Sequence, residues 1–172
     1  MSRKILLTGP PGCGKTTLIR KIAQSLGQGA NGFYTEERVE SGRRIGFDIV
    51  TLDGRRAPLS HVKSRTRYRV GKYGVNIEAI DSVAVPSIEN AIAQCRTVIV
   101  DEIGKMELFS ERFKSAVQRA ISAPNPLIAV IMLKSNPFAD SIKSVPGVRI
   151  INISPANRDL LLRDILEALG IT

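Results

Sequence analysis

The residues best suited to chemistry stand near the start of the chain. Residues 9–16, read as Gly-Pro-Pro-Gly-Cys-Gly-Lys-Thr, match the pattern G-x-x-x-x-G-K-[ST] at every position. Glycines allow backbone N–H groups to close around phosphate oxygens, and the N-terminus of a following helix adds a positive dipole. The motif therefore predicts a loop that binds the phosphates of a nucleoside triphosphate.

Three side chains of this loop have separate expected roles. We expect Lys15 to reach the β- and γ-phosphates, Thr16 to supply a hydroxyl to Mg²⁺, and Thr17 to contact the α-phosphate. An ordinary turn between a strand and a helix is the alternative explanation. The expected phosphate-binding residues are Gly9, Pro10, Pro11, Gly12, Cys13, Gly14, Lys15, Thr16 and Thr17.

A second motif lies at residues 98–102, where three apolar residues precede Asp101 and Glu102. Acidic residues at the carboxyl end of a buried parallel strand face the side of the sheet where ligands bind. We expect Asp101 to hold Mg²⁺ through water and Glu102 to polarise a water that attacks the γ-phosphate. The motif favours hydrolysis over transfer, and an acidic helix cap is the alternative.

The transition state of phosphoryl transfer also requires cations beyond Lys15 and Mg²⁺. The candidates are Lys105, Lys134 and three residues of a basic segment, Arg67, Arg69 and Lys72. The predicted catalytic set is Lys15, Glu102, Lys105 and Arg69, and the predicted metal ligands are Thr16 and Asp101.

The elements that must position these residues follow from the hydrophobic pattern. Short apolar runs predict buried strands, and apolar residues at helical spacing predict helices between them. We expect strands at 4–8, 97–100, 127–133 and 148–153, and helices at 15–26, 87–94 and 110–121 with a last one from Ser154-Pro155. The alternation predicts an α/β fold with a mainly parallel central sheet flanked by helices.

A different pattern occupies the stretch between the first two of these strands. Residues 32–39 and 44–52 are β-prone runs separated by Glu-Ser-Gly-Arg, which predicts an inserted antiparallel hairpin. The following basic segment, residues 55–74, has no clear period, so we expect a mobile loop.

Composition limits the remaining possibilities. The chain has 172 residues, a length suited to one domain over 1–172, and a net charge of +9. No apolar run reaches the length of a membrane span and no leader is recognisable, so a cytoplasmic location is expected. Two cysteines without metal-ligand spacing predict neither a disulfide framework nor a zinc site.

The motifs resemble those of THEP-type nucleoside triphosphatases over nearly the whole chain. The resemblance lies in residues 9–17, 32–37, 46–47, 70–75, 101–107 and 157–159, and the run that ends at Glu107 is particularly specific. It implies a RecA-like P-loop fold and Mg²⁺-dependent hydrolysis of ATP, GTP, CTP and other triphosphates with loose base preference. It also implies nucleotide binding by Val98, Ile99, Val100, Asp101, Glu102, Ile103, Gly104 and Lys105.

Two other functions remain open from the sequence. A nucleotide or small-molecule kinase would share the phosphate loop, but Glu102 argues against transfer to an acceptor. A nucleic-acid-stimulated ATPase would use the basic run of residues 55–72, although charge alone specifies no partner. We expect nucleoside triphosphates as the partners, no membrane association, and a monomer.

Overall fold

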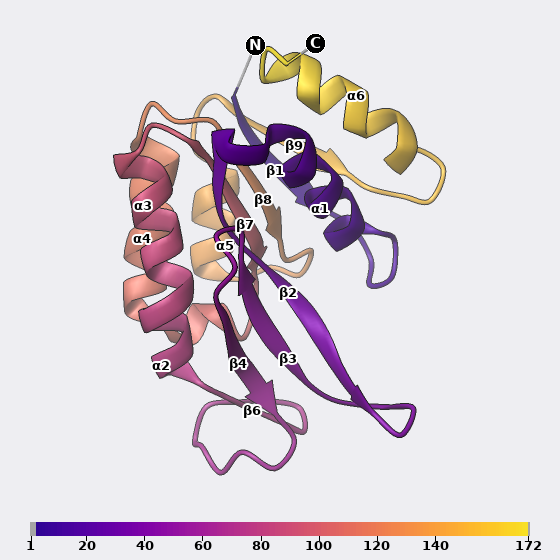
Figure 1. Cartoon of the computed structure of the whole chain (residues 1–172), viewed down its shortest axis with the longest axis vertical. Helices are drawn as coiled ribbons and strands as arrows, with labels where there is room; N and C mark the ends of the chain where they lie inside the picture. Colours follow the sequence, from indigo (N-terminus) through magenta and orange to yellow (C-terminus); the bar gives the residue numbers. More distant parts are fainter. Residues whose placement is uncertain (1–2, 172) are drawn as a thin grey trace.

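The computed structural model describes residues 3–171, which form one nine-stranded mixed sheet with helices on both faces (Figure 1). The strand order is β5-β6-β4-β3-β2-β7-β8-β1-β9. The strands are β1 (Lys4–Thr8), β2 (Ala30–Glu40), β3 (Arg43–Thr51), β4 (Arg56–His61), β5 (Arg69–Val70), β6 (Tyr73–Val75), β7 (Thr97–Ile103), β8 (Leu127–Ile131) and β9 (Val148–Asn152). The predicted α/β fold class is confirmed.

One half of the sheet is parallel. Strand β1 pairs with β8 and β9, while β7 pairs with β8 and β2, and every one of these pairs is parallel. Alternate residues of these strands enter two different cores, as the pleat requires. In β1, for example, Leu6 packs into one core, and Ile5 and Leu7 pack into the other. Burial on both faces explains why β1, β7 and β8 read as continuous apolar runs.

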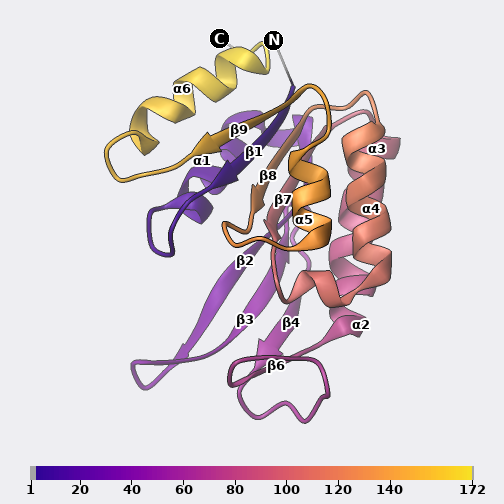
Figure 2. The same ribbon diagram turned by 180° about the vertical axis from the view of Figure 1, so that it is seen from behind.

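The helices divide between the two faces (Figure 2). Helices α1 (Lys15–Leu26) and α6 (Arg158–Ala168) cover one face, and α3 (Val85–Ala93), α4 (Glu111–Ser122) and α5 (Pro137–Lys143) cover the other. The strands and helices that carry the two motifs agree with the sequence to within a few residues. Within the described residues, no helix combines the length and apolar character needed to cross a membrane.

Some helix boundaries differ from the prediction. Helix α5 was not expected, although Asn136 caps it by accepting hydrogen bonds from the N–H groups of Phe138 and Ala139, and Pro137 follows at its first position. The last helix begins at Arg158 rather than at Pro155, because the Asn157 side chain accepts the Ser154 N–H at 2.9 Å and closes a turn there.

The first expected helix after the basic segment also starts earlier than predicted. A short helix α2 (Ile77–Ala79) and a π-helical turn η2 (Ile80–Ala84) run directly into α3. Asn76 begins the helical stretch by accepting the N–H of Ala79 at 3.1 Å.

The antiparallel half of the sheet is larger than the predicted hairpin. Strands β2 and β3 pair as expected, and β4, β6 and β5 then extend the sheet in antiparallel order. The expectation of a mobile loop over 55–74 was wrong for much of this segment. Leu59, only 2% exposed, packs into the core shared with α3, and this burial holds β4 in the sheet.

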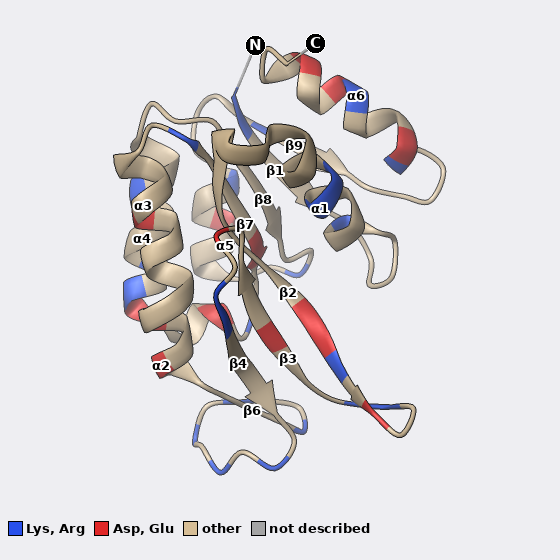
Figure 3. Ribbon diagram, in the orientation of Figure 1, with Lys and Arg blue, Asp and Glu red and all other residues tan. Residues whose placement is uncertain are grey.

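Ion pairs also fix the start of the basic segment. The Arg56 guanidinium bonds to Asp48 at 2.9 Å and to Glu36, and both acids lie on the neighbouring hairpin. Arg55 pairs with Asp53 in the turn before β4, and further basic residues are spread around the loop beside β6 (Figure 3). The segment showed no helical period because it is part strand and part loop.

Candidate active site

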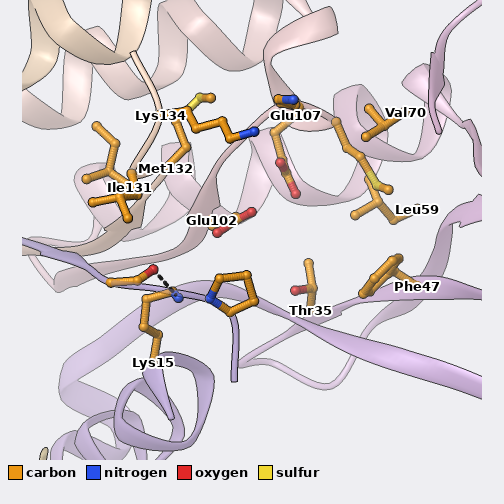
Figure 4. Close-up of a pocket in the computed structure, with 15 residues that line it drawn as sticks. Lys15, Thr35, Phe47, Leu59, Val70, Glu102, Glu107, Ile131, Met132 and Lys134 are labelled. Atoms are coloured by element: carbon orange, nitrogen blue, oxygen red, sulfur yellow. Dashed lines mark hydrogen bonds between the residues drawn. The ribbon is translucent and has the colours of Figure 1, made fainter. Parts of the chain in front are cut away.

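The phosphate-binding motif forms the turn between β1 and α1, as predicted. Gly14 occupies the position before the helix with φ of 97°, a conformation that glycine adopts without steric cost. The Lys15 amine donates hydrogen bonds to the carbonyls of Gly9 at 2.7 Å and Pro10 at 2.8 Å, so it lies across the mouth of the loop (Figure 4). The helix N-terminus and this amine together create a site for anions.

The two predicted metal ligands meet, although they are 85 positions apart. Thr16 Oγ1 donates a hydrogen bond to Asp101 Oδ2 at 2.6 Å. Asp101 is 2% exposed, and burial raises its pKa to about 7 against the opposing effect of the Thr16 hydrogen bond. The adjacency of β1, β8 and β7 in the sheet brings the first motif beside the second.

Glu102, the residue after Asp101, lines the same cavity as Lys15. Gly104 makes room for this side chain, because a Cβ at residue 104 would lie 2.5 Å from Glu102 Oε1. Burial raises the pKa of Glu102, and the positive charge of Lys15 acts in the opposite direction. A carboxylate of raised pKa beside a phosphate loop is suited to accept a proton from water.

A second carboxyl group lies opposite Glu102 and had no predicted role. Glu107, in the 3₁₀ turn η3 (Glu107–Phe109), is 3% exposed and points toward Glu102 (Figure 4). Burial raises its pKa well above the ordinary value, and the nearby charge of Glu102 adds to this shift. The resembling run 101–107 ends at this residue, which was the available signal for its position in the site.

These groups line a cavity of about 380 Å³. Lys15 and Glu102 form its polar end, and Glu107 faces inward from the opposite wall (Figure 4). The remaining wall is mostly apolar and comes from both halves of the sheet. Its apolar residues include Phe47, Leu59, Val70, Met106, Ile131, Met132 and Leu133.

The structure separates the candidate cations into two groups. Lys105 and Lys134 line the cavity, and the Lys134 amine points into it (Figure 4). Arg69 is not brought to the cavity, since its guanidinium donates to the carbonyls of Ser64 at 2.8 Å and Lys72 at 2.7 Å. Arg67 likewise bonds to the Tyr68 hydroxyl at 2.7 Å.

The expected nucleotide-binding stretch 98–105 is also divided. The side chains of Val98, Ile99 and Val100 are at most 1% exposed and pack in the two cores, so they support the site from beneath. Of the stretch, Glu102 and Lys105 reach the cavity wall.

A second hollow lies on the other side of the phosphate loop. Gly14, Thr17 and Arg158 line it together with residues of α1 and α6. A Cβ at residue 14 would lie 3.1 Å from the Arg158 side chain, which shows how closely this arginine approaches the loop. Arg158 belongs to the resembling segment 157–159 but had no assigned role, because its sequence position lies 144 residues from Gly14.

Comparison with known proteins agrees with this geometry. The family model described as NTPase matches residues 4–166. Nucleoside-triphosphatase THEP1 of Thermotoga petrophila is 49% identical over 166 residues, which cover 96% of this chain and 92% of that protein.

Two solved structures resemble the whole fold. The crystal structure of THEP1 from Aquifex aeolicus superposes with a TM-score of 0.89 at 40% identity, covering 96% of this chain and 98% of that one. The solution structure of a human cancer-related nucleoside triphosphatase gives a TM-score of 0.84 at 41% identity, covering 98% and 97%. The motifs, the fold and these relatives together establish that the chain belongs to the NTPase family.

Proposed function

We propose that this protein hydrolyses nucleoside triphosphates, including ATP, GTP, CTP and UTP, to the diphosphate and phosphate with Mg²⁺. The observation that carries the proposal is that Lys15 and Glu102 line one end of a cavity while their chain neighbours Thr16 and Asp101 are hydrogen-bonded to each other. Each of these side chains has a chemical role in hydrolysis of a terminal phosphate.

Lys15 and the helix N-terminus bind the phosphates. The amine already lies at the mouth of the loop, within 2.8 Å of two of its carbonyls, and can turn to the β- and γ-phosphate oxygens. Charge that develops on these oxygens is stabilised by a preorganised cation and by backbone N–H dipoles.

The oxygen atoms of Thr16 and Asp101 fit Mg²⁺. This ion takes hard oxygen donors and is usually held by one or two protein groups together with phosphate and water. Here a hydroxyl and a buried carboxyl approach each other to 2.6 Å beside the phosphate loop. When bound, Mg²⁺ neutralises developing charge on the phosphates.

Glu102 acts on the attacking water. It lines the cavity together with Lys15, on the side where a terminal phosphate would point. Its carboxylate accepts a proton from the water, and Lys105 at the same wall stabilises the negative transition state. Arg69 remains in its loop in this arrangement.

We further propose loose choice of base and a monomeric enzyme. The hollow beside Gly14, Thr17 and Arg158 lies on the α-phosphate side of the loop and would receive the nucleoside. Arg158 is exposed there, so a base would lie at the surface with few contacts to select it. All the proposed catalytic groups come from one chain, which requires no partner subunit.

Phosphate release from ATP, GTP, CTP and UTP with Mg²⁺ and no acceptor tests the proposal. We expect release from all four. Lys15→Ala and Glu102→Gln should each reduce turnover by about 10²–10³-fold, with Glu102→Gln still binding nucleotide. Release that begins only after an acceptor or an oligonucleotide is added would contradict the proposal and favour a kinase or a nucleic-acid-stimulated ATPase.

A further inference from the structure

The cavity beside Glu102 is larger than hydrolysis requires. An attacking water occupies roughly 30 Å³ of liquid volume. The cavity measures about 380 Å³, which lies within the range of about 300–1,000 Å³ of small-molecule pockets. Most of its space therefore serves neither the water nor the terminal phosphate.

The walls of this space are chemically unlike a phosphate site. Phe47 of β3, Leu59 of β4 and Val70 of β5 form the side contributed by the antiparallel half of the sheet. Phe47 is held from behind by Tyr73, with ring centroids 5.5 Å apart in an edge-to-face arrangement. Such an apolar surface favours the apolar part of a ligand, because burying apolar area is favourable at roughly 25 cal/mol per Å².

The opposite side adds two flexible methionines. Met106 follows β7 and Met132 follows β8, and both are half-buried in the wall. Methionine side chains adapt their shape to apolar ligands. None of these five apolar residues has a role in binding phosphate or activating water.

Besides Lys15 and the carboxyl groups of Glu102 and Glu107, two further lysines line the cavity. Lys105 and Lys134 are exposed at its mouth, and among residues 3–171 neither has an ion pair with an Asp or Glu side chain. The Lys134 amine nevertheless points into the cavity rather than away from it (Figure 4). An anionic group on an otherwise apolar molecule would satisfy this cation.

We propose that the cavity binds a second small molecule, a mainly apolar or aromatic compound with one anionic group, beside the terminal phosphate of the bound nucleotide. Its apolar body packs against Phe47, Leu59 and Met132, and its anionic group pairs with Lys134. The placement relative to the terminal phosphate rests on the proposed function. An occupant at this position excludes water from Glu102 and slows hydrolysis.

The nucleotide and this molecule can bind together. In the proposed function the phosphates lie on the loop of residues 9–16 and the nucleoside lies in the separate hollow lined by Arg158. The second molecule should therefore lower kcat for phosphate release and leave KM for ATP nearly unchanged.

The experiment uses the fluorescent aromatic sulfonate 8-anilinonaphthalene-1-sulfonate as the probe and neutral N-phenyl-1-naphthylamine as its uncharged counterpart. Each is titrated into the full chain saturated with Mg²⁺ and a non-hydrolysable ATP analogue. Three variants test the wall and the cation: Met132→Trp fills the cavity, Lys134→Met removes the cation, and Lys114→Met removes a lysine that pairs with Glu111 on α4 as the control.

We expect the sulfonate to bind at one site in the presence of the analogue. Binding should weaken by about tenfold for the neutral probe and for Lys134→Met, because each lacks one charge-assisted contact, and should stay within about twofold for Lys114→Met. Met132→Trp should abolish binding while circular dichroism shows an unchanged fold.

Three results would overturn the inference. Displacement of the sulfonate by the ATP analogue would make the cavity the nucleoside's own pocket. If Lys114→Met weakens binding as much as Lys134→Met, the sulfonate binds through the general positive charge of the protein and not through Lys134. If Met132→Trp binds the sulfonate as wild type does, the probe binds outside this cavity. Failure of the proposed function is a separate result, because it is seen as absent phosphate release when no probe is added.

Discussion

The parallel and antiparallel halves of the sheet contribute to the site in different ways. In the parallel half, Lys15 begins α1 after the loop that follows β1, and Asp101 and Glu102 lie near the end of β7, so short motifs place the proposed reactive groups. In the antiparallel half, Phe47 and Leu59 offer only apolar surface to the same cavity. Local motifs thus supply the chemistry, and the added strands supply the shape of the space around it.

Leu59→Ala is expected to have the largest effect among the changes that distinguish the two halves of the sheet. Leu59 is 2% exposed in the core between β4 and the helices, so its truncation should lower the free energy of unfolding by about 2–5 kcal/mol. Phosphate release per folded molecule should remain within a few-fold of wild type. Urea unfolding measures the first quantity, and Val39→Ala at a position 60% exposed serves as the control.

A loss of turnover equal to that of Glu102→Gln in folded Leu59→Ala would contradict this separation. It would mean that the antiparallel half positions the reactive groups as well as the cavity wall.

In contrast to Leu59→Ala, Asp101→Asn should lower turnover more than it lowers the free energy of unfolding. The amide keeps the volume beside Thr16 but removes the negative charge that favours Mg²⁺. We expect turnover to fall by about 10–100-fold at a fixed Mg²⁺ concentration, with partial recovery as Mg²⁺ is raised. Asp140→Asn on α5, away from the phosphate loop, is the matched control. Equal turnover in both variants would exclude the metal role of Asp101.

Arg158→Ala tests the far side of the phosphate loop. The side chain approaches Gly14 and lines the hollow assigned to the nucleoside, so its loss should weaken binding of the ATP analogue by about tenfold. Arg163 on the same helix pairs with Glu167 at the surface, so Arg163→Ala should change binding little. Calorimetric titration compares the two, and unchanged affinity in Arg158→Ala would move the nucleoside away from this hollow.

The smallest effect is expected for Glu107→Gln in protein free of Mg²⁺ and nucleotide. Burial and the charge of Glu102 raise the folded-state pKa of Glu107 above its ordinary 4.5, so the folded chain binds more protons than the unfolded chain above that pH. Wild-type stability is therefore lost as the pH rises through this window. The glutamine cannot ionise and avoids the loss.

Urea unfolding from pH 4.5 to pH 8 measures this difference, starting at the ordinary pKa of the carboxyl group. The variant should equal wild type at the acidic end and become relatively more stable with rising pH. A constant difference at all pH values would show that Glu107 titrates alike in both states.

Much of the parallel half could be predicted from the sequence. Burial on both faces makes β1, β7 and β8 continuous apolar runs, and the glycine-rich motif marks the end of one strand and the start of a helix. The predictions failed where contacts between distant segments determine the secondary structure. Strand β4 has little apolar pattern of its own, and it forms because Leu59 meets the core and Arg56 meets Asp48 and Glu36.

The same limit applies to the site. The sequence contained no sign that Arg69 would bond to the carbonyls of its own loop while Lys134 points into the cavity. Nor did it place Glu107 opposite Glu102, although both belong to one short motif.

By itself the sequence determined the proposed reactive groups of this protein, because the phosphate loop and the acidic strand end depend on residues that are neighbours in the chain. Only the tertiary structure decided how those groups meet and what surrounds them. The hydrogen bond from Thr16 to Asp101 requires the order of β1, β8 and β7, and the cavity requires walls from β3, β4 and β5. Strand order and side-chain packing arise from contacts between distant segments, which no local pattern encodes.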